Sequence, residues 1–234
     1  MQDKLAPKAA THRWCRGILF MLLWIAVWAL AQLMEYTAHA SVWFPASGLT
    51  YAALLIIGSS AILPILLCAV IVTFVTCIQY GLPLDLPQVI QAGLLFGAAH
   101  ILPYWLSVQL FIWIARIGRL STPGLIIVYI INTGVASLCT TLLVIYSLVF
   151  SNMMQPSEIS QTWLAFWIGD YAGVLILAPL FAALLSEQFN NKRFLLKSYL
   201  SPNQTKPSEF YYCKLMLVTL LVIFTTILNQ STQQ

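Results

Sequence analysis

Apolar runs long enough to cross a lipid bilayer follow one another along most of the 234 residues. A helix needs about 20 apolar residues to cross the hydrocarbon, where it must satisfy all of its own backbone polar groups. Only 8% of the residues are charged, whereas soluble domains carry roughly 25%. The sequence therefore predicts an all-α, polytopic transmembrane helical bundle. Its expected partner is the lipid bilayer, and no nucleic acid is expected to bind it.

The first apolar run begins at Gly17 and is longer than the roughly 7–15 apolar residues of a signal peptide, which favours an uncleaved span. We predict a cytoplasmic N-terminal segment (1–16), a sensor bundle of six spans (17–185), a cytoplasmic linker loop (186–211), a further span (212–229) and a tail (230–234). The predicted spans are residues 17–34, 43–58, 61–80, 89–115, 124–150, 162–185 and 212–229. Seven spans would place the two ends of the chain on opposite sides of the membrane.

The basic residues predict the orientation of these spans. Lys and Arg accumulate in cytoplasmic loops. With the N-terminus inside, all eleven Lys and Arg fall on the cytoplasmic side, while Glu35, Asp85 and Glu158 fall on the outer side. The inner loop around Gly58 carries no positive charge and is the weakest part of this assignment. We expect a cytoplasmic N-terminus.

Asp170 lies in the middle of the sixth predicted span. A charged side chain at that depth is costly unless it is paired, so such residues usually face the interior of a bundle and often have a function. Gly169 and Gly173 are four residues apart and allow a close approach of another helix. Asp170 is therefore a candidate contact for a ligand, a proton or an ion. The alternative is that it bonds a neighbouring helix and locks the packing.

His100 is a possible partner for Asp170. It follows Gly93 and Gly97, which are also four residues apart and predict a second closely packed helix face. A His–Asp pair would satisfy both polar groups inside the membrane. A lone buried histidine is, however, often only a packing residue with its own hydrogen bonds.

A second candidate site lies at the start of the second predicted span, at Trp43 and Pro45. Proline suits a helix start because its missing N–H is not needed there, and tryptophan suits the membrane interface. Those two preferences are a sufficient structural explanation. The free N–H groups of a helix start could also hold a small anionic or polar ligand, and Glu35 is predicted to lie on the same side.

No catalytic, nucleotide-binding or metal-binding motif occurs in the sequence. The five cysteines are odd in number and lie mostly within predicted spans, where they serve as small apolar residues. We therefore expect no catalytic residues, no metal and no cofactor.

Two motifs in this order resemble a known family. The segment Trp43-Phe-Pro-Ala-Ser-Gly-Leu49 resembles the second span of the MASE1 membrane-associated sensor domains, and Phe166–Pro179 resembles their late Trp-x-Gly-Asp-x-x-Gly-x-x-x-x-x-Pro motif. The resemblance covers nearly the whole chain, and the second motif is the more specific. It singles out Trp43, Pro45, Gly48, Trp167, Gly169, Asp170, Gly173 and Pro179.

The resemblance implies an eight-span sensory module in the bacterial inner membrane, of the kind that precedes histidine kinases and diguanylate cyclases. This chain departs from that pattern at three points. Ser59 and Ser60 stand where basic residues are usual, we predict seven spans, and no kinase or cyclase follows in the sequence.

These observations predict a non-catalytic input module of a two-component or related signalling system. It would pass an unidentified small-molecule or membrane signal to a cytoplasmic output domain, as a homodimer or through a partner protein. The alternative is a small-solute transporter or a membrane substrate-binding subunit, since interrupted helices and an intramembrane acid also occur there. An intramembrane enzyme is a third interpretation, for which one Asp and one distant His are poor evidence.

Overall fold

The structure is a computed structural model that describes residues 6–37, 40–118 and 120–189. The chain divides into two compact units, Met1–Asn191 and Lys192–Gln234, and all described residues lie in the first. The predicted seventh span and nearly all of the predicted linker loop lie outside the described residues.

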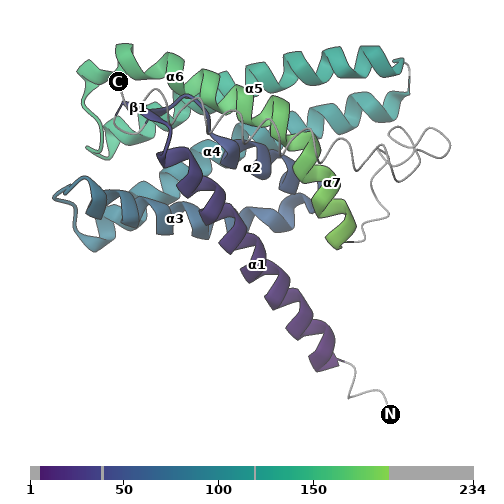
Figure 1. Cartoon of the computed structure of the whole chain (residues 1–234), viewed down its shortest axis with the longest axis horizontal. Coiled ribbons are helices and arrows are strands. Elements are labelled where there is room, and N and C mark those ends of the chain that lie inside the picture. Colours follow the sequence, from purple (N-terminus) through teal and green to yellow (C-terminus); the bar gives the residue numbers. More distant parts are fainter. Residues whose placement is uncertain (1–5, 38–39, 119, 190–234) are drawn as a thin grey trace. The chain divides into compact units, whose positions relative to one another are not determined.

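The described residues form helices joined by short turns, with one small β-hairpin (Figure 1). The elements are α1 (Ala6–Gln32), β1 (Glu35–Thr37), β2 (Ala40–Ser41), α2 (Pro45–Ile56), the 3-10 turn η1 (Gly58–Ala61), α3 (Ile62–Gln79), α4 (Leu86–Ile117), α5 (Thr122–Phe150), the 3-10 turn η2 (Pro156–Glu158), α6 (Ile159–Ala172), the π-helical turn η3 (Gly173–Leu177) and α7 (Ala178–Phe189). The strands β1 and β2 are antiparallel and pair Glu35 with Ser41.

Five helical segments in the described part of the chain are long and apolar enough to cross a membrane. They are Cys15–Gln32, Gly58–Gln79, Leu86–Ile117, Thr122–Phe150 and Pro156–Ser186. The last of these combines α6, η3 and α7 into one span. Large apolar side chains such as Ile18, Leu63 and Leu142 are exposed on these helices, as expected for surfaces that face lipid. The chain is therefore a multi-pass, all-helical membrane protein.

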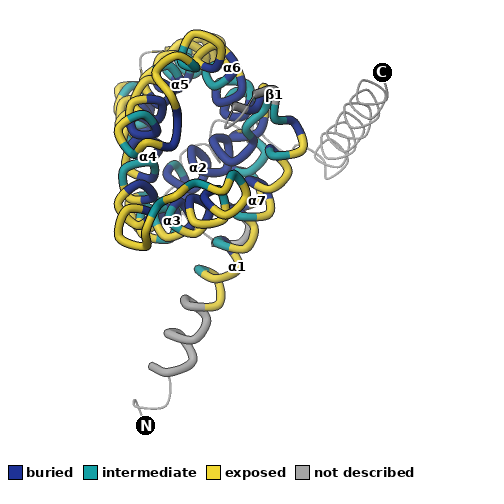
Figure 2. Tube along the Cα trace, turned by 90° about the vertical axis from the view of Figure 1, so that its left-hand side faces the viewer, coloured by how far each residue is buried: buried dark blue, intermediate teal, exposed yellow. Residues whose placement is uncertain are grey.

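The helix α2 is shorter than the span predicted over residues 43–58. It has 12 residues, so its length is about 18 Å, whereas the hydrocarbon core is about 30 Å thick. Eleven of its residues are buried, and it packs against α1, α4, α6, η3 and α7. Figure 2 shows α2 enclosed by the neighbouring helices, whose exposed residues lie on the outside. A sequence that is apolar all round suits a buried core helix as well as a span.

The two ends of the bundle differ in which turns they contain (Figure 1). The β-hairpin lies at the same end as the turn between α3 and α4 and the turn between α5 and α6. The turn between α4 and α5 lies at the opposite end, just after Arg116. We call these the Glu35 end and the Arg116 end.

Helix α4 has well-defined signals at both of its ends. The Asp85 carboxylate accepts a hydrogen bond from the Gln88 amide, and the Gln88 side chain accepts one from the Asp85 amide, both at 2.9 Å. This reciprocal capping satisfies two amides that have no partner within the helix. The helix ends at Gly118, whose φ of 66° is easily adopted by glycine. The capping therefore defines where α4 begins at the Glu35 end, and Gly118 defines where it ends at the Arg116 end.

Candidate functional site

Asp170 lies in α6, three residues before the π-helical turn η3, and only 4% of its surface is exposed. The backbone around it touches the segment that leads into α2. A Cβ atom added to Gly169 would overlap the carbonyl oxygen of Ser41, and one added to Gly173 would overlap that of Phe44. The two glycines therefore let the chain before α2 lie directly against the backbone of α6.

Hydrogen bonds stabilise this contact between the segment that leads into α2, residues 41–44, and α6; we call the contact the crossing. The Phe44 amide donates to the Gly169 carbonyl at 3.1 Å. The Ser47 hydroxyl lies 2.9 Å from the Asp170 carbonyl oxygen and 2.7 Å from that of Phe44. Irregular backbone inside a membrane protein is tolerated only where its polar groups find such partners. The start of α2 is thus held against α6 beside the Asp170 side chain.

The π-helical turn directly follows this crossing and ends just before Pro179. Proline has no N–H and its ring crowds the carbonyl four residues earlier, so it disfavours regular α-helical bonding in the preceding turn. Single π-helical turns occur frequently at functional sites. Pro179 explains why α6 and α7 are joined by a wider turn at this point.

Asp170 lines a partly open cavity of about 70 Å³ inside the bundle. The residues that line the cavity come from α1, β1, β2, α3, α4, α5 and α6 and from the segments between them. Glu35, His100 and Asp170 all line it. These three candidates, far apart in the sequence, are therefore brought to one place.

His100 is almost fully buried, and its Nε2 atom lies 3.3 Å from the Thr50 hydroxyl. The same hydroxyl accepts a hydrogen bond from the Trp24 indole at 2.9 Å. Phe96 stacks on the imidazole, with 6.1 Å between ring centroids. Among the described residues, His100 contacts the Thr50 hydroxyl and has no hydrogen bond to Asp170, so the direct pair that the sequence left as one possibility is not formed.

Tyr104 instead lies close enough to Asp170 to interact with it electrostatically. Tyr104 is fully buried and its hydroxyl also lies 3.3 Å from that of Ser137 in α5. Sequence reasoning missed Tyr104, although it lies four residues after His100 and so on the same helix face. This spacing was the feature of the sequence that could have indicated Tyr104.

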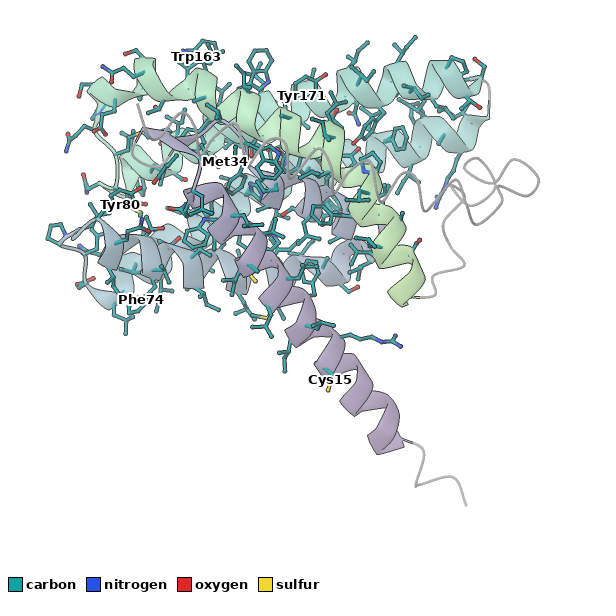
Figure 3. The ribbon with its side chains drawn as sticks, in the orientation of Figure 1. Cys15, Met34, Phe74, Tyr80, Trp163 and Tyr171 are labelled. Atoms are coloured by element: carbon teal, nitrogen blue, oxygen red, sulfur yellow. The ribbon has the colours of Figure 1, made fainter. Side chains whose placement is uncertain are left out.

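Glu35 lies at the edge of the cavity and accepts a hydrogen bond from the Tyr80 hydroxyl at 2.5 Å. Figure 3 shows Tyr80 at the end of α3, next to the chain that enters the β-hairpin. Gln32, one turn before Glu35, also lines the cavity. Neither Tyr80 nor Gln32 has a sequence signal that would have predicted its place in the site.

The remaining candidates lie outside the cavity lining. Pro45 is the first residue of α2, and Trp43 precedes it in the crossing segment. The Trp167 indole donates to the Gly134 carbonyl at 3.2 Å and so joins α6 to α5.

The glycines of α4 lie close to α3. A Cβ on Gly93 would lie 2.7 Å from the Cα of Val70, which places α4 tightly against α3. A Cβ on Gly97 would lie 2.7 Å from the Leu66 Cδ1 atom and 2.9 Å from the Ala69 Cβ atom, so Gly97 lies against side chains of α3.

The described residues contain no group of three or more His, Cys, Asp or Glu side chains that could hold a metal ion. The four described cysteines, Cys15, Cys68, Cys77 and Cys139, are not paired in disulfides.

The fold and this cavity define a multi-pass helical membrane protein with a buried polar site near one end of its bundle. Residues 16–233 match the model of the MASE1 family, and the chain belongs to that family of non-catalytic membrane sensor domains. No curated protein and no solved structure matches the chain.

Proposed function

We propose that this chain is the input module of a bacterial inner-membrane receptor. A small solute would bind in the cavity and change the packing of α2 against α6. The change would pass to a cytoplasmic histidine kinase or diguanylate cyclase domain, or to a partner protein, within a homodimer or a mixed complex. The observation that carries the proposal is Asp170, a buried acid that lines a cavity beside the crossing with α2.

The distribution of charge supports a cavity that opens to the periplasm. Glu35, Asp85 and Glu158 belong to the Glu35 end, and Arg116 to the opposite end. Because basic residues favour the cytoplasmic side, the Arg116 end would be cytoplasmic. The ligand would then come from outside the cell.

Helix α2 is suited to carry the signal. It starts beside Asp170 and ends at Ile56, immediately before η1 at the start of α3. The π-helical turn η3 provides an element with two alternatives, since the same residues can form a π-turn or a regular α-turn. A ligand that favours one arrangement would shift the population of the whole bundle toward it.

The test uses a cyclase chimera, in which a diguanylate cyclase domain is fused to a terminus of this chain that faces the cytoplasm. Cyclic di-GMP is measured in cells without other cyclases, at equal amounts of protein in the membrane. We expect Asp170→Asn to change the output severalfold. Glu158→Gln is the matched control, because glutamine can also accept the cap hydrogen bond that Glu158 accepts from the Gln155 amide. Equal output from all three chimeras would refute the proposal.

Reporter fusions at Gln234, one active in the periplasm and one in the cytoplasm, determine which terminus can be used. A cytoplasmic Gln234 would support a directly attached output domain. A periplasmic Gln234 would support seven spans and a route through a partner protein.

A transporter is the second candidate, favoured by the short helix α2, which begins inside the bundle as the broken helices of transporters do. Uptake of a solute into sealed vesicles, driven by a proton or ion gradient, would support it over a sensor.

A further inference from the structure

We infer that Tyr129 is a positioning residue, whose hydroxyl holds the π-helical turn η3 in the arrangement described here and couples this turn to α2 and α4. The inference rests on the proposed function and deepens it, because it names a side chain through which a change in η3 would reach other helices. It follows from one hydrogen bond, from the ring contacts of the same side chain and from two buried hydroxyls on the neighbouring helices.

The Tyr129 hydroxyl joins α5 to η3. It donates a hydrogen bond to the Val174 carbonyl at 2.7 Å, and the Val174 side chain is fully buried. The same carbonyl accepts a hydrogen bond from the Ala178 amide, so both of its lone pairs are used. Because Pro179 has no N–H, the backbone directly after η3 offers one donor fewer than a regular helix would. A side-chain donor at this place therefore supports the irregular turn.

This hydrogen bond depends on the form of η3. Amides of a π-turn bond to the carbonyl five residues earlier, whereas those of an α-helix bond to the carbonyl four residues earlier. A change between the two forms reorients the carbonyls of the segment, so it would separate the Val174 carbonyl from the Tyr129 hydroxyl. A second tyrosine makes a bond without this dependence, because the Tyr171 hydroxyl of α6 donates to the Ile130 carbonyl of α5 at 3.2 Å.

The ring of Tyr129 contacts two further helices. It meets Tyr51 of α2 edge to face with 6.0 Å between ring centroids, and Phe111 of α4 with 5.9 Å. Aromatic pairs prefer such geometries and resist displacement from them. A movement of the Tyr129 side chain would therefore be felt by α2 and α4. Tyr129 itself lies about two turns after Thr122, where α5 begins at the Arg116 end.

Two buried hydroxyls on α2 and α4 provide a reason for a second arrangement. The hydroxyls of Tyr51 and Ser107 have no hydrogen-bond partner among the described residues. Ser107 lies close enough to Tyr51 to interact with it electrostatically. A buried hydroxyl without a partner is costly. An arrangement in which these two hydroxyls bond to each other would offset the loss of the Tyr129 hydrogen bond, and two states of similar free energy are what a switch requires.

Carbon-13 NMR of the full chain in lipid nanodiscs tests the two arrangements. Tyrosine is labelled at Cζ, whose resonance responds to hydrogen bonding of the hydroxyl, and the Tyr129 resonance is the one that Tyr129→Phe removes. We expect Pro179→Ala to move this resonance toward that of a free hydroxyl. Tyr51→Phe should move it the opposite way, because that variant removes an unsatisfied hydroxyl from the arrangement described here.

Tyr171→Phe is the matched control for the NMR experiment, and it should leave the Tyr129 resonance in place. The inference is overturned if Pro179→Ala leaves the resonance unchanged, if Tyr51→Phe does not move it the opposite way, or if Tyr171→Phe moves it as far as Pro179→Ala does.

The cyclase chimera measures whether the contact matters for signalling, at equal amounts of protein in the membrane. Tyr129→Phe keeps the ring contacts and removes only the hydroxyl, and we expect it to change the output severalfold. Tyr51→Phe should change the output in the opposite direction. Tyr171→Phe also removes a hydrogen bond between α5 and α6 but leaves the Val174 carbonyl bonded, so it should signal as the unmodified chimera does. Equal output from Tyr129→Phe and Tyr171→Phe would overturn the inference.

The two experiments separate this inference from the proposed function. An output that responds to Asp170→Asn but not to Tyr129→Phe would refute the inference alone. The expected NMR shifts, together with an output that none of these variants changes, would support the two arrangements of η3 and refute the sensory role.

Discussion

The carbonyl oxygen of Gly173 occupies the space that a Cβ atom on Gly48 would need. The first turn of α2 and the π-helical turn η3 therefore touch through their backbones, in the turn that follows Asp170. A contact without intervening side chains transmits small displacements directly, because no flexible group lies between the two elements to absorb them.

Gly173→Ala should destabilise the protein by about 1–3 kcal/mol, the usual cost of forcing an extra carbon into a packed interior. The new Cβ would overlap the Phe44 carbonyl oxygen and would lie 2.5 Å from the Ser47 hydroxyl oxygen. Gly17→Ala is the control, since nothing lies within 4 Å of a Cβ at that position. Thermal unfolding in nanodiscs would measure both, and equal stability of the two variants would contradict the close contact.

Thr50→Val should cost about 1–2 kcal/mol, because the Trp24 indole loses its acceptor and the His100 imidazole its partner. Thr141→Val is the matched change, because the buried Thr141 hydroxyl has no partner among the described residues. Removing that hydroxyl should leave stability unchanged or raise it. Denaturant titration would give the free energy of unfolding of both variants. A larger decrease in Thr141→Val than in Thr50→Val would be inconsistent with this hydrogen-bond network.

Trp167→Phe should lower stability more than Trp163→Phe, by about 0.5–1.5 kcal/mol. The two rings stack on each other with 6.4 Å between centroids, so each variant keeps an aromatic pair. Only the Trp167 indole donates a described hydrogen bond, to the Gly134 carbonyl of α5. Unfolding temperatures of the two variants test this, and an equal decrease would rule out a contribution from the hydrogen bond.

Pro179→Ala should change the output of the cyclase chimera without lowering stability. Alanine restores the missing N–H and removes the clash with the preceding turn, so it favours a regular α-helix over the π-turn. Pro103→Ala is the control, because Pro103 also lies within a helix but has no π-turn next to it. If both variants signal as the unmodified chimera does, η3 is not the element that switches.

The sequence predicted the long spans well because their length and lack of charge are strong local signals. The prediction over residues 43–58 was wrong in length, since a buried helix such as α2 and a lipid-facing helix have the same apolar composition. For the same reason the sequence could not show which helix faces point inward. It indicated Asp170, His100 and Glu35 separately, and the packing of several elements was needed to place them around one cavity.

The residues missed by sequence reasoning have no distinctive local pattern. Tyr80 ends an apolar helix, and nothing in its neighbourhood indicates a bond to Glu35, 45 residues away. Trp43, Pro45 and Trp167 are prominent in the motifs, yet none of them is among the residues that line the cavity. Trp43 and Pro45 lie where the chain enters α2, and Trp167 joins α6 to α5. The residues of a sequence motif can therefore be ones that the packing of the backbone requires, as well as ones that bind a ligand.

The most direct test of the sensory account is amide hydrogen exchange at the turn η1, Gly58–Ala61. This turn follows the C-terminal end of α2, whereas Asp170 lies beside the N-terminal end of that helix. Exchange at these residues is compared by mass spectrometry among the unmodified chain, Asp170→Asn and Glu158→Gln in nanodiscs. We predict that Asp170→Asn changes the exchange of this turn and that Glu158→Gln does not. Identical exchange in all three proteins would contradict a signal path from the cavity through α2.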